Sequence, residues 1–281
     1  MRLLESRSDG GFSLTENLLD KDVFRYPYAI LSHRWGDTNE EVTFEDIVNG
    51  SGRNKAGYKK IEFCGEQASK DGLKYFWVDS CCIKKSSDSE LSEAINSMYR
   101  WYNRATRCYV YLSDVSIGTD EDSFVQSVWD GSFRASAWFS RGWTLQELLA
   151  PDSVEFFAEE RIRLGDKGSL SRQIHEITGI ALPALQGTSL SKFGIDERFK
   201  WAQNRHTTRD EDWAYSLLGI FNISMPLIYG EGRDRAVTRL KKEIHESSKS
   251  LWTVEYNSMP TTSQIVHRPE WKFMLSRNSE S

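Results

Sequence analysis

Three short apolar runs, separated by helical patterns, constrain the fold of this chain most. The runs lie at residues 28–31, 75–78 and 108–112, and each one ends in polar residues. Between them are two stretches, 55–70 and 87–105, in which apolar residues recur at helical spacing. Parallel strands need long crossover connections, which are usually helices. The alternation therefore predicts an α/β fold with a parallel sheet of four or five strands flanked by helices.

The second half of the chain has a different pattern. Residues 154–157 are typical of one further strand, with 161–164 as a possible partner. Helical spacing then recurs at 170–177. A capping-box pattern at 208–211 predicts the start of another helix, which should stop at Gly219. We therefore expect a mostly helical second half packed on the sheet.

These patterns suggest how the chain divides. We predict a single domain over residues 1–247, with the α/β core at about 25–150 and the helical extension at about 151–247. After Ser247 the composition turns polar, so residues 248–281 are expected to form a linker or tail.

Composition excludes several classes of protein. The chain has 281 residues, of which 39% are hydrophobic, and this suits a globular protein. Its net charge of −5 argues against general nucleic-acid binding. No apolar run approaches the roughly 20 residues that a membrane helix needs. The N-terminus does not read as a secretory signal, so the four cysteines are expected to be reduced thiols in the cytoplasm. The histidines are scattered without metal-ligand spacing, so we expect no metal site.

Polar residues follow the predicted strands. Ser32, His33, Arg34 and Trp35 come directly after the first apolar run, and Asp79 follows the second. In an open parallel sheet, ligands bind outside the carboxyl ends of the strands. We therefore expect these side chains to lie at one edge and to line a cleft.

A glutamate among apolar residues is the main candidate for chemistry. Glu147 lies in a predicted short helix at 141–149 and follows Arg141 and Trp143. A buried carboxyl tends to have a raised pKa and can act as an acid, a base or a stabiliser of positive charge. The alternative is a surface glutamate on a helix whose other face packs. If Glu147 is buried, its helix should reach the same edge of the sheet as Ser32.

Several long stretches resemble the fungal heterokaryon-incompatibility (HET) domain. The similar segments occur in the order expected for the family, and the agreement is closest to the subgroup found at the front of NACHT–WD40 receptors. They comprise residues 28–36, 76–85, 141–148, 205–215 and 226–232.

The HET family in turn is distantly similar to TIR domains. Residues 32–37 resemble the segment after the first TIR strand, and 143–148 resemble the segment that carries the TIR glutamate. Thr144 stands where TIR domains usually have a cysteine, and Trp35 is inserted between arginine and glycine. The region after about Pro151 has no TIR counterpart. The resemblance implies a TIR- or flavodoxin-like sheet.

The resemblance also implies an activity. It places Glu147 as the catalytic residue that hydrolyses the nicotinamide–ribose bond of NAD, with NAD as the substrate rather than a cofactor. Trp35 or Trp143 is a candidate to stack on a base or nicotinamide ring, and Arg34 or Arg141 to pair with the pyrophosphate. The predicted substrate-binding residues are Ser32, His33, Arg34, Trp35, Asp79, Arg141 and Trp143. Whether NAD or NADP is preferred, and whether the product is cyclic, stays open.

The implied biological role is a death-inducing effector in heterokaryon incompatibility. It would act as a homo-oligomer on activation, with a fused or partner NACHT/WD40 sensor. Two alternatives remain at this stage. The first is a non-enzymatic signalling module that self-associates. The second is a cysteine hydrolase built on Cys81 or Cys82 with His33 and Asp79.

Overall fold

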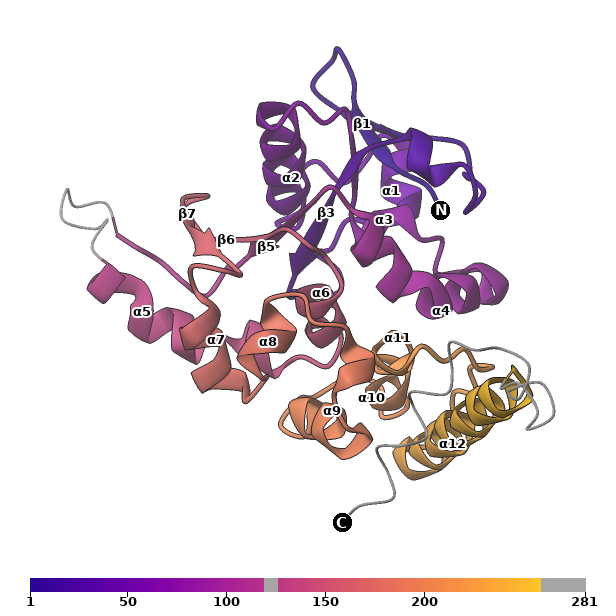
Figure 1. Cartoon of the computed structure of the whole chain (residues 1–281). Coiled ribbons are helices and arrows are strands. Elements are labelled where there is room, and N and C mark those ends of the chain that lie inside the picture. The colour runs from indigo at the N-terminus through magenta and orange to yellow at the C-terminus, as the bar shows by residue number, and fades with distance from the viewer. Residues whose placement is uncertain (119–125, 259–281) are drawn as a thin grey trace, which may run out of the picture.

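The fold is built around a seven-stranded sheet. The computed structural model of the chain describes residues 1–118 and 126–258 (Figure 1). The strands occur in the order β2-β1-β4-β3-β5-β6-β7. Their bounds are β1 (Leu4–Ser6), β2 (Phe12–Leu14), β3 (Tyr28–His33), β4 (Tyr75–Trp77), β5 (Arg107–Tyr111), β6 (Val154–Phe157) and β7 (Arg163–Asp166).

The centre of this sheet is parallel. Strand β3 pairs in parallel with β4 and β5, and β5 pairs in parallel with β6. All six residues of β3 are buried, as is usual for a central strand covered on both faces. The predicted α/β class is therefore confirmed, with four parallel strands where four or five were expected.

The edges of the sheet are antiparallel. Strands β1 and β2 add to β4 on one side, and β7 adds to β6 on the other. Residues 161–164 were expected to supply the partner of β6, and β7 begins two residues later, at Arg163. The sheet thus takes strands from outside the predicted core at 25–150. Because β1 and β2 are only three residues long, they leave no periodic pattern in the sequence.

Helices cover both faces of the sheet. Phe76 of β4 lies against α2, close to Gly65, whereas the neighbouring Trp77 packs its ring edge-on against Trp101 of α4. Consecutive residues of a strand point to opposite faces, so α2 and α4 lie on opposite sides, as Figure 1 shows. The helices of this half are α1 (Phe44–Asn49), α2 (Tyr58–Lys70), α3 (Asp79–Cys82), α4 (Asp88–Arg104), α5 (Gln126–Ala135) and α6 (Thr144–Leu149).

The start of α4 forms half of a capping box. Ser87 is the N-cap, and its hydroxyl accepts a hydrogen bond from the N–H of Glu90 at 3.4 Å. The Glu90 carboxylate does not return to Ser87. It accepts from the N–H of Lys84 at 2.9 Å and pairs with Arg2. Glu90 thereby ties the loop after α3 and the segment before β1 to α4.

The second half is mostly helical, as predicted. Figure 1 shows α9 to α12 as a layer below the sheet. The bounds are α7 (Ser171–Thr178), α8 (Leu182–Leu185), α9 (Ile195–Ala202), α10 (Asp212–Tyr215), α11 (Leu218–Phe221) and α12 (Arg233–Ser258). The short 3-10 helices among the described residues are η1 (Val23–Arg25), η3 (Ala137–Ser140) and η4 (Leu190–Lys192).

The prediction of a capped helix that starts after residues 208–211 and stops at Gly219 is wrong in two respects, its cap and its end. The Glu211 carboxylate accepts hydrogen bonds from the N–H groups of Gly230 and Gly232, at 2.8 and 2.9 Å, so it does not complete a capping box. The helix divides into α10 and α11, and Gly219 lies inside α11 rather than ending it. A Cβ atom on Gly219 would lie 2.0 Å from Cβ of Tyr99, so close packing against α4 explains this glycine.

The last helix is longer than its apolar pattern. Helix α12 continues past residue 247 to Ser258, so the first part of the predicted linker or tail is helical. Residues 259–281 of that segment lie outside the described residues.

Candidate functional site

The carboxyl ends of the parallel strands bring the predicted site residues together. Nε1 of Trp35, after β3, donates a 2.8 Å hydrogen bond to Oδ2 of Asp79, after β4. Nδ1 of His33 lies 3.9 Å from Oδ1 of Asp79. Arg34 lies 3.8 Å from Asp114, which follows β5. The predicted convergence of the strand ends is therefore present.

Glu147 reaches this edge from α6. The hydroxyl of Ser32 donates to Oε2 of Glu147 at 2.5 Å, and Nε1 of Trp138 donates to the Ser32 oxygen at 2.9 Å. Ser32 is fully buried and Glu147 is 8% exposed. The alternative of a solvated surface glutamate is therefore wrong. Leu145, Leu148 and Leu149 are buried as expected.

Burial controls the charge state of Glu147. It raises the pKa of this carboxyl to about 8, from an ordinary value of 4.5. The hydrogen bond from Ser32 opposes the shift, whereas the nearby charge of Asp79 adds to it. Tyr102 lowers the pKa of Glu147, although its one hydroxyl hydrogen is engaged by the carbonyl of Leu31 at 2.9 Å. Tyr102 is thus a second hydroxyl that favours the ionised form of Glu147.

His33 is buried rather than at the surface. Its side chain is 2% exposed, and burial lowers its pKa to about 3, so the imidazole is neutral at physiological pH. Nε2 of His33 lies 3.9 Å from Glu41, which in turn pairs with Lys60.

Arg141 and Trp143 face the helical half. Arg141 forms an isolated parallel bridge with His206, and its guanidinium donates to the Thr208 hydroxyl at 3.4 Å. Trp143 is partly buried, and its hydrogen bond to Asp212 lowers the pKa of that carboxyl against a larger rise from burial. Arg141 still lowers the pKa of Glu147 through its charge. These two residues therefore connect α6 to the extension.

Arg205 is a buried cation that the sequence did not single out as a site residue. Nη1 donates to the Thr144 hydroxyl at 2.8 Å and to the Arg141 carbonyl at 2.9 Å, and Nε donates to the Trp201 carbonyl at 3.2 Å. Burial lowers its pKa to about 9, and the charge of Glu147 counteracts this. Thr144, which stands where TIR domains usually have a cysteine, is therefore an acceptor for Arg205.

Trp138 and Tyr102 were also missed. Both lie in apolar or helical patterns that read as core, and both are almost fully buried. Their polar atoms contact Ser32 and Leu31 because η3 and α4 both pack on the face of the sheet that carries Ser32. A tryptophan N–H or tyrosine O–H in a core needs a partner, and that need is the one signal that points to a polar site nearby.

The cysteines are packed thiols. All four are free and buried. Burial raises the pKa of Cys81 well above its ordinary value, and the Cys82 sulfur accepts a hydrogen bond from the N–H of Val78. A nucleophilic cysteine needs a lowered pKa and access, so this environment disfavours the cysteine hydrolase.

Two other features bear on the site. Within residues 1–118 and 126–258, no group of three or more His, Cys, Asp or Glu side chains is arranged to hold a metal ion. In the same part of the chain, no helix has the length and apolar character to cross a bilayer.

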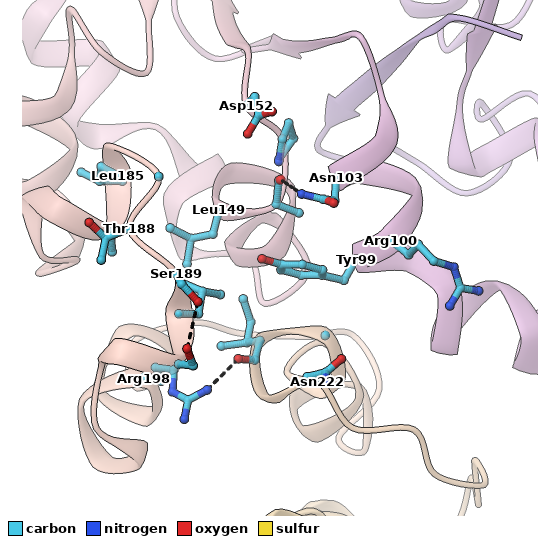
Figure 2. A pocket seen from close by; sticks show the side chains of 18 of the residues that line it. Tyr99, Arg100, Asn103, Leu149, Asp152, Leu185, Thr188, Ser189, Arg198 and Asn222 are labelled. Carbon is cyan, nitrogen blue, oxygen red and sulfur yellow. Dashed lines mark hydrogen bonds between the residues drawn. The ribbon is translucent and has the colours of Figure 1, made fainter. Parts of the chain in front are cut away.

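A cavity of 1260 Å³ lies elsewhere, between the sheet and the helical half (Figure 2). Arg107 and Val154, the first residues of β5 and β6, contribute to its lining, so it opens at the amino ends of the parallel strands. Its other walls include α4, α8, α9 and α11, and neither Ser32 nor Glu147 lines it. Ligands of open parallel sheets bind at the opposite edge, so we place the candidate site at Glu147.

The fold and the buried carboxylate define an α/β domain with a polar site at the carboxyl edge of its sheet. Residues 28–132 match the family model described as heterokaryon incompatibility protein (HET). The resemblance to the HET family seen in the motifs is therefore confirmed over these residues.

A longer similarity links the chain to one named protein. Over 252 residues, which cover 89% of this chain, it is 53% identical to vegetative incompatibility protein HET-E-1 of Podospora anserina. The matched part is 18% of the length of that protein, so the chain spans less than a fifth of it. No solved structure matches the chain.

Proposed function

We propose that this chain is a cell-death effector of fungal incompatibility that hydrolyses the nicotinamide–ribose bond of NAD. The observation that carries the proposal is Glu147, a buried carboxyl held by Ser32 at the carboxyl edge of the sheet. The similarity to a vegetative incompatibility protein supports the biological role.

The chemistry suits a single carboxylate. When the bond between ribose C1′ and the nicotinamide nitrogen breaks, its electron pair neutralises the cationic ring, so no acid is needed to expel nicotinamide. Positive charge develops on the ribose, as in glycoside hydrolysis. An ionised Glu147 would stabilise that charge and take a proton from the attacking water, whose oxygen bonds to C1′. The products are nicotinamide, ADP-ribose and a proton.

The charge state of Glu147 agrees with a regulated base. With a pKa of about 8, the carboxyl is mostly protonated at pH 7 in the free protein. A cationic nicotinamide ring bound beside it would favour the ionised form, because an opposite charge lowers a carboxyl pKa. The hydrogen bond donated by Ser32 suits the carboxylate as acceptor, and the nearby Tyr102 hydroxyl favours the same ionised form.

The remaining site residues are proposed to bind substrate. Trp35 and Asp79 hold each other at the edge of the sheet, and His33 lies 3.9 Å from Asp79 on the buried side. Arg34 is half exposed and would meet a ligand from solvent. Arg141 and Trp143 would act from the side of the helical extension, so substrate would bridge the two halves.

A second candidate function is a non-enzymatic module that triggers death by self-association. The similarity to HET-E-1 favours it, because the name of that protein states incompatibility and no activity. The chain spans 18% of that relative, so we also propose a fused NACHT/WD40 sensor that drives homo-oligomer formation in the cytoplasm.

Measuring NAD loss with the purified domain over a wide range of concentration separates these functions. NAD cleavage that rises with protein concentration, and is lost in Glu147→Gln, supports the enzyme. Glutamine keeps the size of the side chain but cannot carry the negative charge, so the loss should be on the order of 10²–10³ in rate. A folded Glu147→Gln protein that still kills cells would instead support the non-enzymatic module. A thiol alkylator should leave cleavage intact.

A further inference from the structure

A polar cluster surrounds Trp35 beside the Ser32–Glu147 pair. Nζ of Lys85 lies 3.4 Å from the centroid of the Trp35 ring, and the indole N–H donates to Asp79. His33 approaches Asp79 from β3. We call these four residues, Trp35, His33, Asp79 and Lys85, the Trp35 cluster. Trp35 and Asp79 are partly exposed, so the cluster reaches solvent at the edge of the sheet.

Three polar atoms of the Trp35 cluster are buried without a hydrogen-bond partner among the described residues. They are Nε2 of His33, Oδ1 of Asp79 and Nζ of Lys85, which are three of the seven such atoms in the described part of the chain. The ring nitrogens of His33 lie 3.9 Å from carboxylate oxygens of Asp79 and Glu41, which is too far for a hydrogen bond. Buried polar groups are normally paired, so three unpaired ones at one place indicate a site that a ligand or solvent completes.

The other cations near this edge are already engaged. Lys60 pairs with Glu41, Arg34 lies 3.8 Å from Asp114, and Arg141 donates to Thr208. Lys85 touches the face of Trp35 and, in the described chain, has no anion or acceptor within hydrogen-bond distance. Burial lowers the pKa of Lys85, and the charge of Asp79 counteracts this. The cluster therefore holds a lysine amino group without an acceptor and a carboxylate oxygen without a donor.

We propose that Lys85 binds the diphosphate of a nucleotide substrate, while Oδ1 of Asp79 accepts a ribose hydroxyl. A ribose 5′-diphosphate carries both complementary groups, an anion and hydroxyl donors, whereas free phosphate carries no such hydroxyls. The inference rests on the proposed function, and it assigns to Lys85 the role first expected for Arg34 or Arg141. Lys85 acts on a part of the substrate remote from the broken bond, so its loss should raise KM with little change in kcat.

The test compares Lys85→Met with Lys84→Met in the full chain. Lys84 is the exposed neighbour, and methionine in place of Lys85 keeps an apolar stem over Trp35. Calorimetric titration with ADP should give equal affinity for wild type and Lys84→Met. Lys85→Met should bind ADP on the order of 10- to 100-fold more weakly, as expected for a lost charge-assisted hydrogen bond. Adenosine lacks phosphate, so its affinity should be the same for wild type and both variants. Inorganic pyrophosphate lacks ribose, so titration with it should show whether the anion alone suffices for binding.

Equal ADP affinity in Lys85→Met, or no ADP binding to wild type, would overturn the role of Lys85. If Lys85→Met does not fold, amine labelling of the wild-type chain decides instead. ADP should slow labelling of Lys85 and leave that of Lys84 unchanged, and equal effects would refute the proposal. Lys85-dependent ADP binding without NAD cleavage would refute the proposed enzyme alone. NAD cleavage with an unchanged KM in Lys85→Met would refute the Lys85 role alone.

Discussion

The hydroxyl of Ser32 donates a 2.5 Å hydrogen bond to Oε2 of Glu147, 115 residues further along the chain. The same hydroxyl oxygen accepts from Nε1 of Trp138. A strand end, a 3-10 helix and a short α-helix therefore meet at one buried serine. Every donor in this chain of hydrogen bonds points towards the carboxyl, which prepares the position for a negative charge.

Ser32→Ala should raise the pKa of Glu147 further, because the hydrogen bond from Ser32 opposes the effect of burial. The pH at which NAD cleavage reaches half its maximum should therefore move up. The variant should also lose roughly 1–3 kcal/mol of stability, since the Trp138 N–H is left buried without its acceptor. The pH–rate profile and urea unfolding measure the two effects. A profile that does not move would separate Ser32 from the charge state of Glu147.

The free energy of unfolding should fall with rising pH because of Glu147. Its pKa of about 8 in the folded protein lies above the ordinary 4.5, so the folded state holds this proton more tightly than the unfolded state. The stabilisation that this proton contributes is present in full below about pH 4.5 and is lost as pH rises through about 8. Glu147→Gln should remove it, so the stability difference between wild type and variant should change by up to about 1.4 kcal/mol per pH unit.

Urea unfolding of both proteins at several pH values between 5 and 9 provides the measurement. His33 works in the opposite direction, since its pKa of about 3 lies below the ordinary 6.5 and its contribution is lost as pH falls. Both proteins retain His33, so the difference between them isolates Glu147. A difference that is constant across this range would mean that the carboxyl is not protonated in the folded state.

Gly219→Ala should destabilise the contact between α11 and α4. The added Cβ would lie 2.0 Å from Cβ of Tyr99, which cannot move without its helix, so we expect a loss of at least about 1–3 kcal/mol. Gly131→Ala is the matched control in α5, because no atom lies within 4 Å of the position that its added methyl group would take and alanine favours helix. Thermal unfolding should show a lower Tm for the first variant only. Equal Tm values would contradict the close packing.

Arg205→Met should weaken the attachment of the helical half to α6. The substitution removes the hydrogen bonds that Arg205 donates to the carbonyls of Arg141 and Trp201 and to the Thr144 hydroxyl, and each lost bond costs roughly 1–3 kcal/mol. It also removes a positive charge near Glu147, so the pKa of that carboxyl should rise. Arg172→Met is the control, since its side chain is 86% exposed. Limited proteolysis of the helical extension is the measurement, and cleavage should be faster in Arg205→Met. Equally slow cleavage in both variants would argue against this attachment.

The parallel core could be predicted because its signals are local. The three apolar runs around Ile30, Trp77 and Val110 are short and continuous, as buried parallel strands are, and the helices between them have one apolar face. The short strands β1 and β2 and the division of α10 from α11 could not be predicted. Strands of three residues carry no period, and Glu211 imitates a capping residue while its carboxylate serves two glycine N–H groups elsewhere.

The sequence by itself determined which polar residues follow the strands and that one glutamate stands among apolar neighbours. The charge state of Glu147 was decided only by tertiary structure, because the same nine residues suit a solvated helix or a buried one. Burial, the Ser32 hydroxyl and the nearby Asp79 set its pKa, and all three depend on segments far apart in the chain. The unpaired ammonium of Lys85 is likewise invisible in the sequence, since a hydrogen-bond partner is present or absent only once the fold is complete.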